Sequence, residues 1–258
     1  MSPSHRPDPA TLLGTWDSTD RGDTGGILRL RVTVGGGIGL RAWDADGHDW
    51  GTVPAQVYAH TPDAPDAWAL TARYDLGDRR TAISAYGKTG ILVLTTYTGY
   101  RGTDPRAASF TRAFCYPVPD GTTDPAPGGQ RRTDPTGPVD PGPLAGTWVN
   151  FDPQATGLAG VEVRPDGTGL LVQPRGTGHL LPREWQTAAG PVYRDATGTS
   201  SAAAVAFTAD FPLSGGSAGI VGYVNRRLLT IECAVRPAGT DSSPYFVREH
   251  FYAVNPST

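Results

Sequence analysis

One glutamate in an otherwise apolar segment is the side chain best placed to do chemistry. In "LLTIECAV" (228–235), period-two alternation puts Glu232 on the same face as Thr230, and the opposite face carries Leu229, Ile231 and Cys233. If Glu232 faces a dry cavity, its carboxyl pKa rises and the group can act as a general acid or base. If it faces water, it is an ordinary strand exterior, the commoner position for a charged side chain.

Two further carboxylates are candidate catalytic groups. Asp49 directly precedes Trp50, and Glu184 directly precedes Trp185, so the two acids occupy equivalent places in two similar stretches of chain. We expect them either at the rim of an opening or in solvated loops.

Aromatic side chains suggest where a ligand would bind. Walls of Trp and Tyr with a few polar tips suit a rigid, mostly apolar small molecule. The spacing of eight residues between Trp50 and Tyr58 recurs between Trp185 and Tyr193, and a regular strand puts both rings of each pair on one face. The alternative is that these rings fill a core. The ligand-binding candidates are Trp50, Tyr58, Tyr74, Tyr86, Trp185, Tyr193 and Tyr223.

The usual patterns for metals, nucleotides and nucleophilic serines are missing from the sequence. The five histidines are scattered, and there is no Cys-x-x-Cys. "VGGGIG" (34–39) resembles a phosphate loop only superficially, because no helix pattern and no Lys-Ser/Thr follow it. No serine sits in a Gly-x-Ser-x-Gly elbow. We therefore predict no metal site and no cofactor.

The net charge and the lack of long apolar segments argue against nucleic acids and membranes as partners. With 22 basic and 25 acidic residues the net charge is −3, which argues against nucleic-acid binding. No segment has the apolar run of a signal peptide or a membrane span. We expect a cytoplasmic protein. Its expected partner is an apolar or amphiphilic small molecule and not a membrane. The sequence also leaves room for a homo-oligomer. Cys115 and Cys233 are expected to be buried, reduced thiols rather than a disulfide.

The segments that carry these residues occur in two copies. "GTW" at 14–16 recurs at 146–148, "WGTVPAQVY" (50–58) resembles "WQTAAGPVY" (185–193), and "SFTRAFCY" (109–116) resembles "YFVREHFY" (245–252). Between the copies, 118–143 holds seven prolines and five glycines, which is typical of an extended linker. The sequence thus predicts an N-terminal domain over 1–117, a linker over 118–143 and a C-terminal domain over 144–258.

Each copy has the pattern of an all-β domain. Thirty-four glycines and 24 prolines disfavour long helices. "ILRLRVTV" (27–34) and "VEVRP" (161–165) alternate apolar with polar side chains, as strands with one wet face do. Six to eight short strands joined by tight turns predict an antiparallel barrel or sandwich in each half, and a barrel leaves no open edges.

An early Gly-x-Trp, followed about a hundred residues later by an arginine, resembles the signature of the calycins, which include lipocalins, fatty-acid-binding proteins and avidins. The candidate pairs are Trp16 with Arg112 and Trp148 with Arg248. The resemblance implies two tandem antiparallel up-and-down barrels, each with an indole at its closed end and a guanidinium packed across that ring. A generic β-sandwich with a core tryptophan is the alternative.

Three functions follow from this interpretation. Resemblance to lipocalin-like cyclases implies a cofactor-independent cyclase or isomerase that holds a polyketide-type intermediate in a barrel lumen, with Glu232, Glu184 or Asp49 moving a proton. The second is a non-catalytic carrier of a small molecule. The third is a tandem carbohydrate-binding module. The enzyme predicts chemically different halves, whereas the tandem module predicts equivalent exposed aromatic sites in both.

Overall fold

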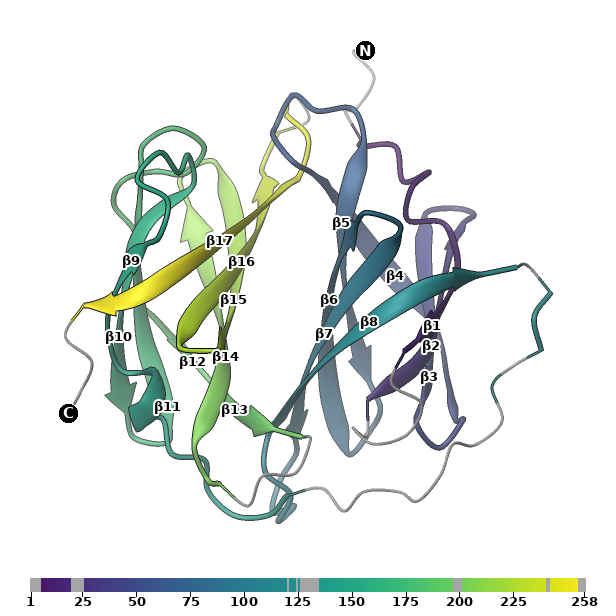
Figure 1. The fold of residues 1–258 in the computed structure, drawn as a ribbon, viewed down its shortest axis with the longest axis horizontal. Helices are drawn as coiled ribbons and strands as arrows, with labels where there is room; N and C mark the ends of the chain where they lie inside the picture. Colours follow the sequence, from purple (N-terminus) through teal and green to yellow (C-terminus); the bar gives the residue numbers. More distant parts are fainter. Residues whose placement is uncertain are drawn as a thin grey trace.

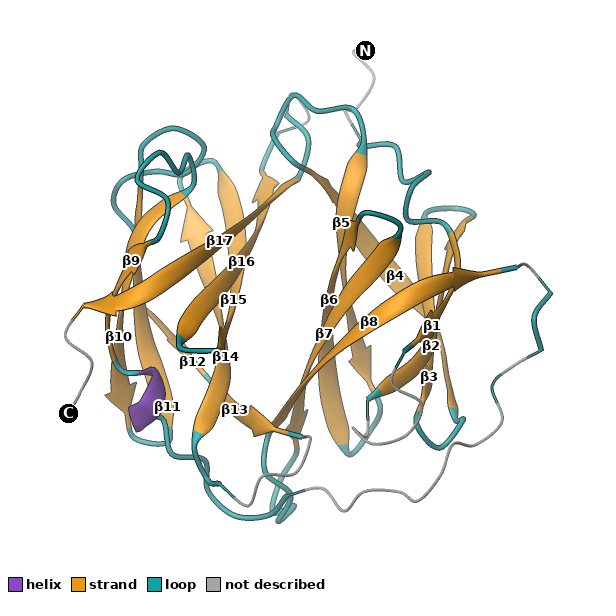
Figure 2. Ribbon diagram, in the orientation of Figure 1, coloured by secondary structure: helices purple, strands orange, loops and turns teal. Residues whose placement is uncertain are grey.

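The protein is all-β. The computed structural model describes residues 6–19, 26–119, 121–123, 125, 135–196, 201–239 and 242–254. These residues form one hydrogen-bonded sheet of 17 strands, and their one short helical segment is the 3₁₀ turn η1 (Gly142–Leu144) (Figure 2). Within these ranges there is no helix of the length and apolarity needed to cross a bilayer.

The strands of the first half pair in chain order and return on themselves. They are β1 (Gly14–Ser18), β2 (Ile27–Val34), β3 (Ile38–Asp44), β4 (Asp49–Ala59), β5 (Ala67–Asp75), β6 (Arg79–Lys88), β7 (Ile91–Tyr100) and β8 (Ser109–Val118). Every neighbouring pair is antiparallel, and β1 pairs with both β2 and β8. The ring of strands that results is filled by apolar side chains, among them Trp16, Leu40 and Tyr74.

The second half repeats this order with one interruption. Its strands are β9 (Gly146–Asn150), β10 (Leu158–Asp166), β11 (Gly169–Gly176), β12 (Ala188–Gly190), β13 (Val192–Asp195), β14 (Ala204–Leu213), β15 (Gly216–Asn225), β16 (Leu228–Pro237) and β17 (Tyr245–Val254). Here β9 pairs with both β10 and β17. Pro191, which has no N–H to donate, separates β12 from β13. Trp148, Phe207 and Phe251 lie in the core of this half.

Strands of both halves together form a ring. The start of β8 pairs in parallel with β13, at Ser109 and Arg194, and the start of β17 meets the end of β4, at Tyr245 and Ala59. With the ladders within each half, these bridges close β4–β8 and β13–β17 into a central ring of ten strands (Figure 1). The two tandem barrels expected from the sequence are therefore not confirmed as separate units, because strands of both halves belong to this ring. The outer faces of the halves are buried against each other.

Matching contacts in the two halves support the predicted repeat. The indole Nε1 of Trp16 donates to the carbonyl of Leu12 at 3.0 Å, and that of Trp148 donates to the carbonyl of Leu144 at 3.0 Å. The glycine of each Gly-Thr-Trp has a positive φ, +109° for Gly14 and +139° for Gly146. A Cβ at Gly14 or Gly146 would meet no atom within 4 Å, so backbone conformation, not close approach, requires these glycines.

Parts of the predicted linker pack on the folded halves. Arg29 donates from Nη1 to the carbonyl of Thr123 at 2.6 Å, and Arg194 donates from Nη1 to the carbonyl of Thr136 at 3.0 Å. Asp140 forms a parallel bridge with Ala203. The described parts of 118–143 are thus held by specific bonds, while residues 120, 124 and 126–134 lie outside the described ranges.

Candidate functional site

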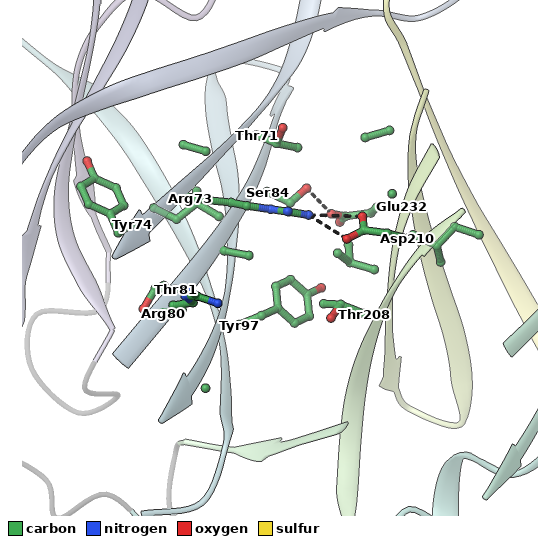
Figure 3. A pocket seen from close by; sticks show the side chains of 18 of the residues that line it. Thr71, Arg73, Tyr74, Arg80, Thr81, Ser84, Tyr97, Thr208, Asp210 and Glu232 are labelled. Carbon is green, nitrogen blue, oxygen red and sulfur yellow. Dashed lines mark hydrogen bonds and ion pairs between the residues drawn. The ribbon is translucent and has the colours of Figure 1, made fainter. Parts of the chain in front are cut away.

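A cavity of about 530 Å³ lies inside the central ring. Both halves contribute to its wall, whereas the interiors of the two halves are filled by their own cores. The space expected inside a single barrel is therefore found between the halves (Figure 3). The polar wall residues include Thr71, Arg73, Ser84 and Tyr97 from the first half and Thr208, Asp210 and Glu232 from the second.

Glu232 borders this cavity from β16. The alternation predicted for the strand is confirmed, because Leu229, Ile231 and Cys233 belong to the core of the second half while Glu232 points away from it. Its exposed fraction is 0%. The alternative that Glu232 faces water is therefore wrong.

The two carboxylate oxygens of Glu232 have different surroundings. Ser84 donates from Oγ to Oε2 at 2.7 Å, a bond that joins the two halves (Figure 3). Among the described residues Oε1 has no hydrogen-bond partner, and it forms an ion pair with Nε of Arg248 at 3.8 Å. Burial raises the pKa of Glu232, and the bond from Ser84 and the charges of Arg248 and Arg112 offset only part of that rise. A carboxyl in this position can hold or release a proton within the cavity wall.

Tyr97 places a second unsatisfied group on the same wall. The side chain is 1% exposed, and its hydroxyl has no hydrogen-bond partner in the part of the chain that the structure describes. Burial raises its pKa well above the ordinary value, so the phenol stays protonated. Buried polar atoms without partners are rare because they forfeit their hydration. Tyr97 and Glu232, the residues that carry these two atoms, line the same cavity, although the atoms themselves have almost no accessible surface.

An exposed ion pair spans the two halves at another part of the cavity wall. Nη2 of Arg73 lies 3.2 and 3.1 Å from the carboxylate oxygens of Asp210 (Figure 3). The two side chains are 70% and 64% exposed. Strands β6 and β7 begin 137 residues before their counterparts β15 and β16, and the two bridges between the halves are equivalent, so a two-fold axis relates the halves. The same offset relates Arg73 to Asp210, which places this ion pair on that axis.

Arg112 does not pack on Trp16, and that prediction is wrong. On β8, Arg112 has the parity of Phe110 and Phe114, whereas Cys115 faces the core of the first half. Its Cζ lies 4.7 Å from the ring centroid of Phe114. The guanidinium therefore points into the space between the halves, while Trp16 is enclosed by its own core.

Arg248 departs from the prediction in the same way. Trp148 lies in the core of the second half, while Cζ of Arg248 lies 4.8 Å from the ring centroid of Tyr86 in the other half. Both arginines follow strand alternation, which places them on the outer face. Both residues of each expected Trp–Arg pair are thus present, but each arginine points out of its own half instead of packing across the tryptophan in its core.

The other two carboxylate candidates lie away from the cavity. Asp49 accepts hydrogen bonds from Nε of Arg41 at 3.0 Å, and this bond is the main cause that holds its pKa below the ordinary value. Glu184 is exposed and forms a backbone bridge with Arg175. Neither residue lines the cavity, so the structure gives them no part in the site.

The predicted pairing of Trp50 with Tyr58 on one face fails. Gly51 takes a φ of +75°, and the register of β3 against β4 shifts there, so strict alternation is interrupted. Trp50 packs edge-on against Tyr74 at 5.3 Å, with Tyr74 inside the first half. Tyr58 lies on the other side, where it borders the cavity and bonds to Thr71 at 3.0 Å.

The second half shows the same division. Trp185 packs edge-on against Phe211 at 5.1 Å in the core, while Tyr193 borders the cavity and bonds to Thr208 at 3.2 Å. Of the remaining ligand-binding candidates, Tyr74 borders the cavity but donates its hydroxyl to the carbonyl of Leu40 at 2.6 Å.

Tyr86 and Tyr223 are buried between the halves beside the arginines and do not line the cavity.

Tyr97 and Ser84 were missed as site residues, although the repeat contains a signal for them. The 137-residue offset aligns Glu232 with Thr95, Tyr97 with Ala234 and Ser84 with Val221. Each of these three residues thus has a smaller or apolar counterpart in the other copy.

A cluster of possible metal ligands and the two cysteines are each accounted for by their structural surroundings. Asp44, Asp46 and His48 bring possible metal ligands within 4.8 Å of one another, but Oδ1 of Asp44 already accepts the backbone N–H groups of Asp46 and His48 in a turn. Cys115 and Cys233 are buried, unpaired thiols, as predicted. Burial raises the pKa of Cys115 to about 12.

Comparison of the chain with protein-family models gave no match, and a search of curated proteins found none either.

Proposed function

We propose that the protein is an enzyme that cyclises or isomerises an apolar or amphiphilic small molecule, of the polyketide type, in the central cavity. The observation that carries the proposal is the pair of unsatisfied buried groups, Oε1 of Glu232 and the hydroxyl of Tyr97, on the wall of one cavity. Glu232 is the general acid and base, Ser84 holds its second oxygen, and Tyr97 donates a hydrogen bond to a substrate oxygen.

The chemistry requires only side chains of this chain. Ionised Glu232 removes a proton from carbon beside a carbonyl, the electron pair moves onto the carbonyl oxygen, and Tyr97 stabilises that oxygen by hydrogen bonding. In isomerisation, protonated Glu232 returns the proton at the new position. In cyclisation, the enolate carbon instead bonds to a second carbonyl carbon of the substrate, the π pair of that carbonyl moves onto its oxygen, and the oxygen takes the proton from Glu232. Confinement between the halves holds a flexible substrate in a folded conformation, which lowers the entropic part of the barrier to ring closure.

We further propose that each half is a modified calycin-like barrel. The closed ring of β1–β8, the repeated Gly-Thr-Trp and the matching tryptophan contacts support this relationship. The outward arginines and the interruption at Pro191 are the departures from it. In this interpretation the barrel interiors became solid cores, and the ligand site moved to the surface where the two barrels meet.

The competing functions make different use of the same structure. A carrier would bind its ligand in this cavity without moving a proton. A tandem carbohydrate-binding module would need equivalent exposed aromatic platforms, and Trp50 and Trp185 pack inside their halves instead.

Proton abstraction from 5-nitrobenzisoxazole tests the proposal without knowledge of the natural substrate, because this compound opens when a desolvated carboxylate removes its C–H proton. We expect wild-type protein to accelerate the opening, with a rate that rises with pH through the raised pKa of Glu232. Glu232→Gln should lose on the order of 100-fold, the usual contribution of a positioned base. Glu162→Gln, an exposed glutamate on β10, is the matched control. Equal rates for wild type and Glu232→Gln would overturn the enzyme and leave the carrier.

A further inference from the structure

We propose that Arg112 and Arg248 form a binding site for a carboxylate or phosphate group, separate from the cavity. The two side chains lie between the halves, Arg112 on β8 and Arg248 on β17, and neither lines the cavity. The anion site adjoins Glu232, because Nε of Arg248 lies 3.8 Å from Oε1 of that residue, but anion binding there does not require the proposed reaction.

Arg112 is a half-buried cation without an acidic partner. Among the described residues it makes no ion pair, and its buried Nε has no hydrogen-bond partner. The rings of Phe114 and Tyr223 lie 4.7 and 5.8 Å from its Cζ. These contacts use the flat faces of the guanidinium, and Tyr86 takes one side-chain hydrogen bond from it. The remaining in-plane N–H donors are of the kind that bind carboxylates and phosphates in pairs.

Arg248 is close to Arg112 and is also incompletely satisfied. Its Nη2 lies 3.4 Å from the hydroxyl of Tyr223, the tyrosine that Arg112 contacts through its ring. Among the described residues its buried Nε has no hydrogen-bond partner and lies 3.8 Å from Oε1 of Glu232, whose other oxygen accepts from Ser84. Because the repeat aligns Arg112 with Arg248, the two guanidinium groups flank the internal two-fold axis.

The surroundings contain more positive than negative groups. His250 lies 3.1 Å from Nη1 of Arg248, and since a guanidinium only donates, Nε2 of His250 accepts and the imidazole is neutral. Lys88 is exposed and near enough to His250 to lower the pKa of that imidazole. One buried carboxylate therefore faces Arg112, Arg248 and Lys88. An anion on the axis would supply the missing charge and the missing hydrogen-bond acceptors.

The test is calorimetric titration of the full-length protein with sodium phosphate and, separately, with sodium acetate, against sodium chloride at matched ionic strength. We expect saturable binding of at least one anion, and the stronger binder distinguishes phosphate from carboxylate ligands. Arg112→Gln should weaken binding at least tenfold, and Arg112→Lys should keep part of it. Arg164→Gln, an exposed arginine on β10 that pairs with Glu162, is the matched control and should bind as wild type does.

Thermal unfolding in chloride separates a binding role from a structural one. Arg112→Gln removes an unpaired, half-buried charge, so we expect its melting temperature in chloride to equal or exceed that of wild type. A large drop in that melting temperature would make Arg112 structural and overturn the site. Equal anion affinities for wild type and Arg112→Gln, or an equal loss in Arg164→Gln, would also overturn it.

Discussion

Glu232 occupies a position at which the two copies of the repeat have diverged. The aligned residue is Thr95, whose hydroxyl donates to the carbonyl of Ser84 at 3.2 Å, whereas Glu232 accepts from the hydroxyl of the same serine. A neutral side chain in one copy and a buried carboxyl in the other make the central cavity asymmetric, although its frame is nearly symmetric. This asymmetry is what the enzyme interpretation requires.

Stability should depend on pH through Glu232. Its folded-state pKa is raised above the ordinary 4.5, so the folded protein binds this proton more tightly, and the associated stability is lost as pH rises from about 4.5 through the raised pKa. Relative to wild type, Glu232→Gln should therefore gain stability with rising pH over that window, by about 1.4 kcal/mol for each tenfold difference in proton affinity between the folded and unfolded chains. Urea unfolding of both proteins between pH 4 and pH 9 measures this, and parallel curves would contradict it.

Tyr97 should matter for ligand contact and not for folding. Its hydroxyl has no partner, so Tyr97→Phe removes an unsatisfied polar group and should leave the free energy of unfolding unchanged or slightly increased. We expect the same variant to slow 5-nitrobenzisoxazole opening or to weaken ligand binding, because the hydrogen bond to the ligand is lost. A fall in stability of more than about 1 kcal/mol would show that the hydroxyl has a structural partner.

At the scale of single strands, the sequence was most informative where alternation is unbroken. The two faces of β16 are as predicted. The segment 27–34 is strand β2 over the predicted residues, but a register shift between Ile27 and Arg29 interrupts its alternation, so that Ile27 lies in the core and Arg29 is buried. The prediction failed at Trp50 because Gly51 changes the parity of β4, which residue types alone do not disclose. It also could not show that the polar outer faces of β5–β8 and β14–β17 meet each other. Alternation of apolar and polar residues shows that a strand has an outer face, but it does not show which part of the protein covers that face.

Close packing inside β14 and β15 provides a test of the second core. A Cβ at Gly222 would lie 2.4 Å from the ring of Phe207, a fully buried side chain. Gly222→Ala should therefore destabilise the protein by about 1–3 kcal/mol, as overpacking does. Gly36→Ala in the exposed β2–β3 turn, where a Cβ meets nothing within 4 Å, is the matched control. Urea unfolding measures both, and equal values would show that this core is looser than described.

The two halves of the chain meet in the way that the two subunits of a homodimer do. The parallel bridges β8–β13 and β4–β17 are equivalent contacts, as expected when two copies of one surface meet across a two-fold axis. The repeat itself was readable from the sequence because its motifs keep their order and spacing. The interface between the copies could not be predicted from the sequence, because it depends on contacts between distant residues, such as Tyr58 with Phe246, that no local pattern relates.

Separately produced halves should therefore associate. Fragments 1–128 and 129–258 would each expose the aromatic and apolar side chains that now meet in the central ring. We expect the fragments to co-elute from a gel-filtration column when mixed, at the size of the intact protein. Two fragments that stay monomeric in the mixture, each with a cooperative thermal transition, would contradict an obligate central ring.

The central claim is that a small molecule binds between the halves and not inside either one. Fluorescence titration with the uncharged dye N-phenyl-1-naphthylamine measures this directly on wild type and on Ala82→Trp, which places a large ring at the cavity wall on β6. The control is Val34→Trp at an exposed position on β2. We predict saturable binding to wild type and Val34→Trp, and at least tenfold weaker binding to a folded Ala82→Trp. Equal affinities for all three proteins would contradict the claim.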